Sequence, residues 1–211
     1  VDVRVSMDDA SIEERARMRH CQTMTGGIWF PDAPRPEDVN PADFRAVARV
    51  NRFGGHTRED VDFYVVAEHL WLCGEWVAEN GGSPQDVYDA HTHDLEEIYP
   101  PGDQLGPILR GEPPDSTILA MSRKAKVAVR TAIGASLVKS EIVSMADRVL
   151  LATEKRDLLN APSPLVKWTD LPEPWGRTSD VWQPRCAWRV WAGRFNALAA
   201  LLQKPLRIPD L

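Results

Sequence analysis

The chain has 211 residues, 43% of them hydrophobic and 27% charged, and its 25 basic and 31 acidic side chains give a formal net charge of −6. This length is enough for one sizeable hydrophobic core, so we expect a single domain over residues 1–211. The apolar runs are too short to cross a bilayer, so we expect no membrane partner, and the net negative charge disfavours binding of duplex nucleic acid.

The first twenty residues carry acidic side chains and lack a continuous apolar stretch, so we expect no signal peptide and a cytoplasmic location.

The three cysteines are widely separated and form no CxxC pair, which argues against a disulfide framework and a thiolate zinc site. We therefore expect reduced and mostly buried thiols at Cys21, Cys73 and Cys186.

The N-terminal part predicts an ordered but irregular lead-in followed by a helix. Residues 22–40 are rich in glycine and proline, and we expect Trp29 and Phe30 to hold this segment in place. Asn40 followed by Pro41 predicts a helix start, because asparagine caps a helix well and proline suits its first turn. The glycine pair in the sequence RFGGHTRED then ends that helix.

A strongly apolar helix is predicted over residues 62–79. Its apolar side chains recur at helical spacing and spread beyond a single stripe, which is typical of a helix buried nearly all round. His69 lies one turn from several of these apolar residues, so we expect its imidazole to point into packed surroundings.

The next helix is predicted to start at Ser83 and Pro84 and to carry His93, Asp94 and Glu97. Residues three and four apart share a helix face, so these last three side chains are expected to project toward one neighbourhood. A Pro-Pro-Gly sequence then stops the helix and opens a loop.

Two long helices and a tryptophan-rich tail complete the chain. Helical spacing predicts helices over residues 116–138 and 140–159, and Asp147 has apolar neighbours one turn away on either side. Pro184 predicts the start of a final helix that ends near Gln203. Strand-like alternation is scarce throughout. Five of the eight tryptophans lie in the C-terminal quarter: Trp168, Trp175, Trp182, Trp188 and Trp191.

Four polar side chains lie in or beside these apolar helical stretches: His69, His93, Asp94 and Asp147. Burying such groups without partners costs several kcal/mol, so a shared divalent cation is the simplest common explanation. Two imidazoles and two carboxylates suit Mn²⁺, Co²⁺, Fe²⁺, Ni²⁺ or Zn²⁺. Such a metal can lower the pKa of bound water from about 15.7 to roughly 7, which favours phosphate ester hydrolysis.

Each residue also has an ordinary structural interpretation. A lone histidine beside an apolar stripe is more often a hydrogen-bonded core residue, and an aspartate within a helix is usually solvated or salt bridged. His91 lies two residues from His93 and so on a different helix face, and we expect it not to bind metal. We expect Glu96 to be a solvated neighbour of Glu97.

The order histidine, histidine-aspartate, aspartate resembles the signature of the HD-domain metal-dependent phosphohydrolases. Four flanking segments resemble phage and prophage members related to bacterial 5′-deoxynucleotidases and cyanophage-type dATP triphosphohydrolases: RFGGH (52–56), YVVAEH (64–69), HDLEEIYPPGD (93–103) and ADRVLLATEKRDLL (146–159).

The resemblance covers roughly residues 22–160, and it implies an all-α fold in which these residues form an HD-domain helical bundle. Residues 161–211 are then a tryptophan-rich extension packed on that core. It further implies a homo-oligomer in the cytoplasm of a bacterium or a phage-infected cell, with a small nucleotide as its substrate.

The resemblance also implies a role for each matching residue in the reaction. The metal ligands are His69, His93, Asp94 and Asp147, and Glu97 orients or deprotonates the attacking water.

Substrate contacts are implied for four further residues. Arg52 holds a phosphate, a task that suits the planar donors of a guanidinium, although a surface arginine after a helix is the alternative. Phe53 packs on the sugar or base, or else belongs to the core. His56 contacts phosphate or merely finishes its turn, and Asp103 belongs to the same substrate site.

The chain departs from the family pattern at three places. Leu95 stands where the family has a small residue, and Pro100–Pro101 add one residue before the next matching segment. The family has a phosphate-binding lysine at the position where this chain has Leu109. Arg110 beside it is the candidate replacement.

The leading hypothesis is therefore a phosphohydrolase that cuts the phosphomonoester of a dNMP or the triphosphate of a dNTP. It would use one divalent transition metal, with Mg²⁺ as a second candidate on the substrate phosphates. A non-catalytic nucleotide-sensing or interaction module is the alternative that the missing lysine and the tryptophan-rich tail favour. A di-iron HD oxygenase is a further one, but it needs additional histidines, and only His20, His56 and His91 are left.

Overall fold

Helices dominate the computed structural model, which describes residues 15, 17–104, 111–162, 168 and 170–209. The long helices are α2 (Val66–Glu79), α3 (Pro84–Thr92), α5 (Thr117–Ile133), α6 (Glu141–Leu158) and α7 (Pro184–Leu201). Short 3₁₀ helices connect them: η1 (Pro36–Asp38), η2 (Pro41–Ala48), η3 (Arg52–Gly55) and η4 (Leu95–Ile98). Within the described residues the only strands, β1 (Cys21–Gln22) and β2 (Ile28–Trp29), form one small antiparallel pair. The expected mostly helical fold is thus confirmed.

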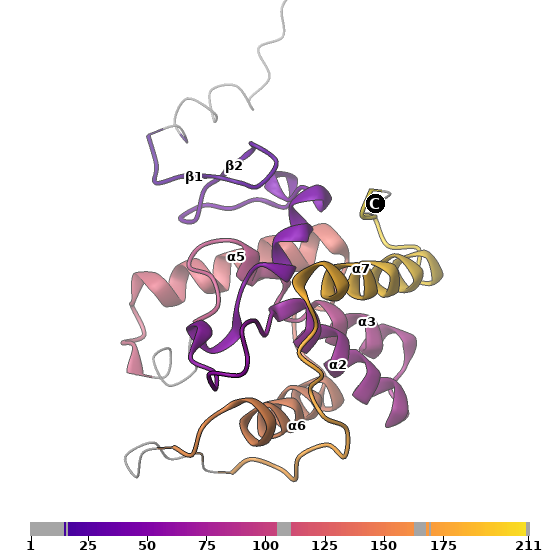
Figure 1. The fold of residues 1–211 in the computed structure, drawn as a ribbon. Coiled ribbons are helices and arrows are strands. Elements are labelled where there is room, and N and C mark those ends of the chain that lie inside the picture. Colours follow the sequence, from indigo (N-terminus) through magenta and orange to yellow (C-terminus); the bar gives the residue numbers. More distant parts are fainter. Residues whose placement is uncertain (1–14, 16, 105–110, 163–167, 169, 210–211) are drawn as a thin grey trace, which may run out of the picture.

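Helices α2 and α3 form the centre of the molecule, with α7 on one side and α6 on the other (Figure 1). Their close approach depends on Gly74, because a Cβ atom there would lie 1.6 Å from Nδ1 of His91. Side chains from all five long helices meet in one hydrophobic core.

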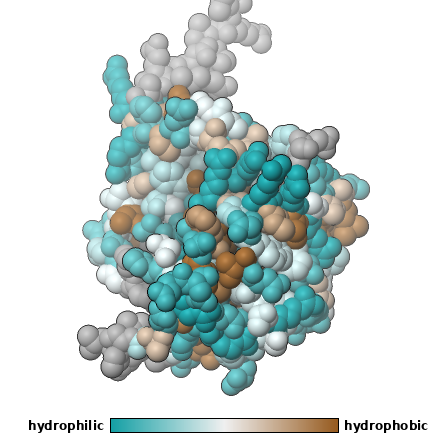
Figure 2. All heavy atoms as spheres, in the orientation of Figure 1, coloured by the Kyte–Doolittle hydropathy of each residue, from teal (hydrophilic) through white to brown (hydrophobic). Residues whose placement is uncertain are grey.

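The face shown in Figure 2 is mostly hydrophilic, with apolar side chains in separate patches. No described helix has both the length and the apolar content that a membrane span requires.

The lead-in is ordered by its aromatic side chains, as the sequence predicted. Trp29 is fully buried and stacks on Tyr99, with ring centroids 3.8 Å apart, and Phe30 is buried as well. This stack joins the hairpin to the end of η4 and therefore to the segment that carries Asp94.

The helix expected at Asn40 begins at Pro41 and is capped by the asparagine side chain, but it is the 3₁₀ helix η2. The helix predicted to begin at residue 62 starts only at Val66. Val65 is extended there and forms an isolated bridge with Asn51, so the chain enters α2 from a strand-like conformation.

The predicted continuous helix through Glu97 is wrong, because α3 ends at Thr92. Asp94 leaves the helical region with φ −122° and ψ 23°, and η4 follows it. The carbonyl of His93 accepts a hydrogen bond from the buried guanidinium of Arg130 at 3.2 Å. This contact gives a carbonyl at the helix end a partner from another helix.

The C-terminal part of the chain shares the central core. Trp188 and Trp191 of α7 are buried, and the indole nitrogen of Trp191 donates to the carbonyl of His91 at 2.9 Å. Before α7, the carboxylate of Glu68 accepts the backbone N–H groups of Val181 and Trp182 at 3.1 and 2.8 Å. This segment is therefore held against the start of α2.

The expectation of mostly buried thiols is wrong. Cys73 alone is buried, whereas Cys21 is partly exposed and Cys186 is exposed, and all three are free.

Candidate metal centre

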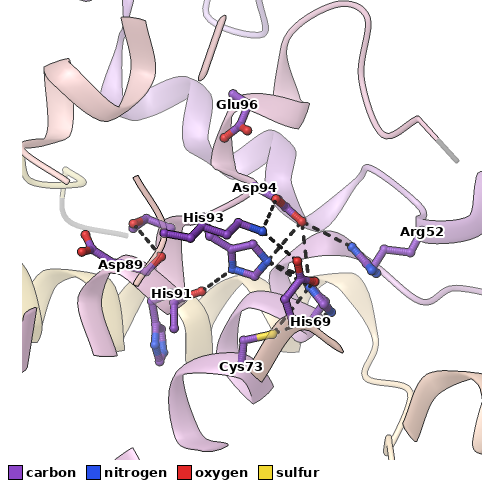
Figure 3. A network of polar contacts seen from close by, with 12 residues as sticks. Arg52, His69, Cys73, Asp89, His91, His93, Asp94 and Glu96 are labelled. Carbon is purple, nitrogen blue, oxygen red and sulfur yellow. Dashed lines mark hydrogen bonds and ion pairs between the residues drawn. The ribbon is translucent and has the colours of Figure 1, made fainter. Parts of the chain in front are cut away.

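The consecutive helices α2 and α3 and the more distant helix α6 bring the four predicted ligands together. His69 lies in the first turns of α2, His93 and Asp94 follow the end of α3, and Asp147 lies in the middle of α6. Both histidines are fully buried, while the two aspartates are partly exposed. Figure 3 shows His69, His93 and Asp94 directed toward one another. The site is therefore closed on its histidine side and more open on its carboxylate side.

The donor atoms are spaced as a cation requires. Nε2 of His69 lies 3.3 Å from Nε2 of His93, 3.9 Å from Oδ2 of Asp94 and 3.5 Å from Oδ1 of Asp147. Nε2 of His93 lies 3.2 and 3.6 Å from the same two oxygens. Bonds of about 2.1 Å place ligand atoms about 3.0 Å apart at right angles and about 3.4 Å apart at tetrahedral angles. The four residues thus fit one divalent cation with small adjustments.

Hydrogen bonds fix which nitrogen of each imidazole faces this centre. Nδ1 of His69 lies 2.6 Å from Oε1 of Glu154, and Nδ1 of His93 lies 2.8 Å from the carbonyl of Ala90. Both partners are acceptors, so each Nδ1 carries the proton and each Nε2 keeps its lone pair for a metal. This is the arrangement that metal-binding histidines require.

Glu154 is a residue of the site that the sequence analysis missed. Its carboxylate is fully buried, accepts the hydroxyl of Tyr64 at 2.8 Å and lies 3.3 Å from the guanidinium of Arg52. Burial alone would raise the pKa of Glu154, yet the charges of Arg52 and His69 hold it below its ordinary value. The available signal was its spacing, because Glu154 follows Asp147 by seven residues and so lies on the same face of α6.

Lys139 is the second residue of the site that the sequence analysis missed. It lies just before α6, with Nζ 2.7 Å from Oδ2 of Asp147 and 3.7 Å from Oδ1 of Asp94. Burial opposes its charge, but these two carboxylates raise the pKa of Lys139. Each aspartate therefore presents one oxygen to the imidazoles and the other to this ammonium.

Both aspartates are ionised in this setting. Burial acts to raise their pKa values, but His93 and Lys139 hold the pKa of Asp94 and that of Asp147 well below the ordinary range. Asp94 and Asp147 thus supply two negative charges and His69 and His93 supply two imidazole nitrogens, which is a donor set suited to a divalent cation.

Glu97 and Asp103 lie beside the carboxylate side of the site. Both are partly buried, and each has one buried carboxylate oxygen without a hydrogen-bond partner. Burial and the nearby charge of Asp94 raise the pKa of both groups, while Arg52 opposes the shift. A cavity of about 130 Å³ adjoins Asp94 and Glu97 and extends to Lys126.

Arg52 is buried, so its interpretation as a surface arginine is wrong. It bridges the two parts of the site, with Glu154 at 3.3 Å and Asp94 at 3.7 Å. Phe53 is partly exposed, has a left-handed φ of 57° and carries the Arg52 guanidinium 5.6 Å above its ring. His56 is exposed at the end of η3 and joins no candidate metal group.

The remaining predicted residues lie apart from this centre or outside the description. His91 points away from the cluster (Figure 3), bonds the carbonyl of Val87 and, because it is buried, has a pKa lowered to about 3. Glu96 is buried and paired with Lys126 at 3.0 Å, so the expectation of a solvated side chain is wrong. Arg110 lies outside the described residues.

The fold and this centre define a class of protein: a mostly helical protein with a buried site of two histidines and two aspartates that can hold a metal ion. No family model matches the chain. The protein YfdR of Escherichia coli (strain K12), described as uncharacterized, is 32% identical over 143 residues, which cover 67% of this chain and 73% of YfdR. The chain belongs to the same family as YfdR. This relationship transfers no activity, because none is assigned to YfdR.

Proposed function

We propose that the protein is a metal-dependent phosphohydrolase of the HD-domain type that acts on deoxynucleotides. The bond cut is either the phosphomonoester of a dNMP or the triphosphate ester of a dNTP. The observation that carries the proposal is the convergence of His69, His93, Asp94 and Asp147, in which the Nε2 atoms of the two histidines lie 3.2 to 3.9 Å from each other and from one oxygen of each aspartate. The flanking segments that resemble HD-domain phosphohydrolases support the same conclusion.

The four ligands would hold one Mn²⁺, Co²⁺, Fe²⁺, Ni²⁺ or Zn²⁺ ion, and Mg²⁺ would accompany the substrate phosphates. When bound, the ion supplies Lewis acidity and a water molecule whose pKa is lowered into the neutral range. The more exposed carboxylate side of the site, with Asp147 at 32% side-chain exposure, is where water and substrate enter.

Glu97 manages the proton of the attacking water. It lies three residues after the ligand Asp94, and its Oε2 atom is buried with no hydrogen-bond partner, so it is free to accept a proton. Burial and the charge of Asp94 raise the pKa of Glu97 above that of an ordinary glutamate, which strengthens it as a base.

Arg52 and Lys139 provide positive charge for the phosphoryl oxygens. Arg52 is fixed by Glu154 and Asp94, and its Nε atom has no partner. Lys139 is held by Asp147 and Asp94, and a cation among the ligands would weaken this attraction. Its ammonium would then be available to a phosphate. Lys139 would thus replace the lysine that the family has where this chain has Leu109.

The test is hydrolysis of every dNMP and dNTP by protein stripped with a chelator and reloaded with Mn²⁺, Co²⁺ or Mg²⁺. Chromatography separates the products, and release of orthophosphate or of triphosphate identifies the bond that is cut. We expect activity in the wild type and in Asp115→Asn, an exposed control, and none in Asp147→Asn. Protein that binds the metal but hydrolyses no nucleotide in this panel would refute the proposal.

A further inference from the structure

A buried thiol lies against the candidate metal centre. Cys73 follows His69 by four residues on α2, so both side chains lie on the same helix face. Its Sγ atom lies 3.6 Å from Nε2 of His69 and 4.0 Å from Nδ1 (Figure 3). The proposed hydrolysis does not use this thiol.

The thiol completes a second donor set that shares both histidines with the first. Donor atoms of His69, Cys73 and His93 lie within 4.8 Å of one another, and all three residues are buried. A tetrahedral cation with a metal–sulfur bond of about 2.3 Å and a metal–nitrogen bond of about 2.1 Å separates the two donors by about 3.6 Å. The distance between Sγ and Nε2 of His69 already has this value.

Cys73 does not belong to the group that contains Asp94 and Asp147. The two histidines can therefore hold an ion toward the carboxylates or an ion toward the sulfur. Oxygen donors favour hard cations such as Mn²⁺ and Mg²⁺, whereas a thiolate favours Cd²⁺ and other thiophilic cations. The choice between these positions is set by the chemistry of the ion.

We propose that this is a metal centre with two modes, in which Cys73 ligates thiophilic cations together with His69 and His93. Binding breaks the S–H bond and forms a metal–sulfur bond, and the proton leaves to the solvent without any change of oxidation state. Hard cations use the histidines with the two aspartates. Occupation of the sulfur mode moves the ion away from the carboxylates and from Glu97.

The test is the spectrum of the Cd²⁺ form, because thiolate ligation gives ligand-to-metal charge-transfer absorption in the ultraviolet. The protein offers a matched control, since the double variant Cys21→Ser/Cys186→Ser removes the other two thiols and keeps Cys73. We expect the absorption in the wild type and in this double variant, and its loss in Cys73→Ser and in Cys73→Ala.

Affinities separate the two modes. Cys73→Ser should weaken Cd²⁺ binding by at least the roughly 10–100-fold that loss of an outer-shell partner costs, and should leave Mn²⁺ affinity within about twofold. Asp147→Asn should weaken Mn²⁺ binding and keep the charge-transfer band. Stoichiometric binding of Cd²⁺ without that band in the double variant would overturn the proposal. These readouts do not involve nucleotide turnover, so their outcome is independent of the proposed hydrolysis.

Discussion

Replacement of Glu154 by glutamine would change the electrostatics of His69 without changing the size of the buried side chain. The carboxylate lies 2.6 Å from Nδ1 of His69 and also holds Tyr64 and Arg52. A carboxylate in this position fixes the imidazole tautomer and increases the basicity of Nε2. The amide keeps one acceptor oxygen but removes the charge.

We expect Glu154→Gln to weaken Mn²⁺ binding by about 10–100-fold, which corresponds to about 1.4–2.7 kcal/mol. The metal-free protein should also lose stability, because Arg52 loses the nearer of its two carboxylates, at 3.3 Å against 3.7 Å for Asp94. Asp94 still compensates the guanidinium, so this loss should stay below the about 3–5 kcal/mol of a fully broken buried pair.

The assay is calorimetric titration of Mn²⁺, together with urea unfolding in the presence of a chelator. Glu141→Gln is the matched control, because Glu141 is exposed at the first position of the same helix. Wild-type Mn²⁺ affinity in a folded Glu154→Gln variant would show that His69 does not act as a ligand supported by Glu154.

Asp147→Ala should abolish both Mn²⁺ binding and turnover, whereas Glu97→Ala should keep Mn²⁺ binding and slow turnover. Mn²⁺ titration and nucleotide hydrolysis assays check both variants, and full activity in either one would refute the assigned roles. Gly74→Ala should destabilise the fold by at least about 1–3 kcal/mol in urea unfolding, because its Cβ would collide with a buried imidazole at 1.6 Å. Gly193→Ala is the control, because no neighbouring side chain lies within 4 Å of the added Cβ, and it should be neutral or stabilising. Equal changes in the free energy of unfolding for Gly74→Ala and Gly193→Ala would contradict the close packing of α2 on α3. Burial raises the pKa of Glu68 from 4.5 to about 7, so its contribution to stability is full below pH 4.5 and is lost as the pH rises through about 7. Between pH 5 and 8 the wild type should therefore lose up to about 3 kcal/mol more than Glu68→Gln, and parallel stability profiles would argue against this shift.

Local sequence signals predicted the start of a helix correctly where a capping residue precedes it. Ser83 begins α3 with a reciprocal capping box to Asp86. The helix predicted over residues 116–138 ends earlier, at Ile133, because Gly134 with its left-handed φ of 68° closes it. The break after Thr92 could not be predicted in this way. It involves a hydrogen bond from Arg130, a residue whose arrival near His93 depends on the packing of α5.

The same contrast applies to the site. The donors were recognisable because polar residues in apolar helices need partners, and three helices do bring them together. Their supporting residues were not recognisable, since Glu154 meets Tyr64 and Arg52 across 90 and 102 residues. Lys139 lies in a short loop with no helical periodicity, so only the tertiary structure reveals its pairing with Asp147.

Because the donors of the candidate centre come from α2, α3 and α6, no single helix can unfold without destroying it. A bound ion would therefore fasten three elements at once, and it would add about 2.7 kcal/mol to the free energy of unfolding at a free ion concentration one hundred times the Kd. The melting temperature of this protein should accordingly follow the supply of metal in its surroundings. Starvation for that ion would then reduce the amount of folded protein.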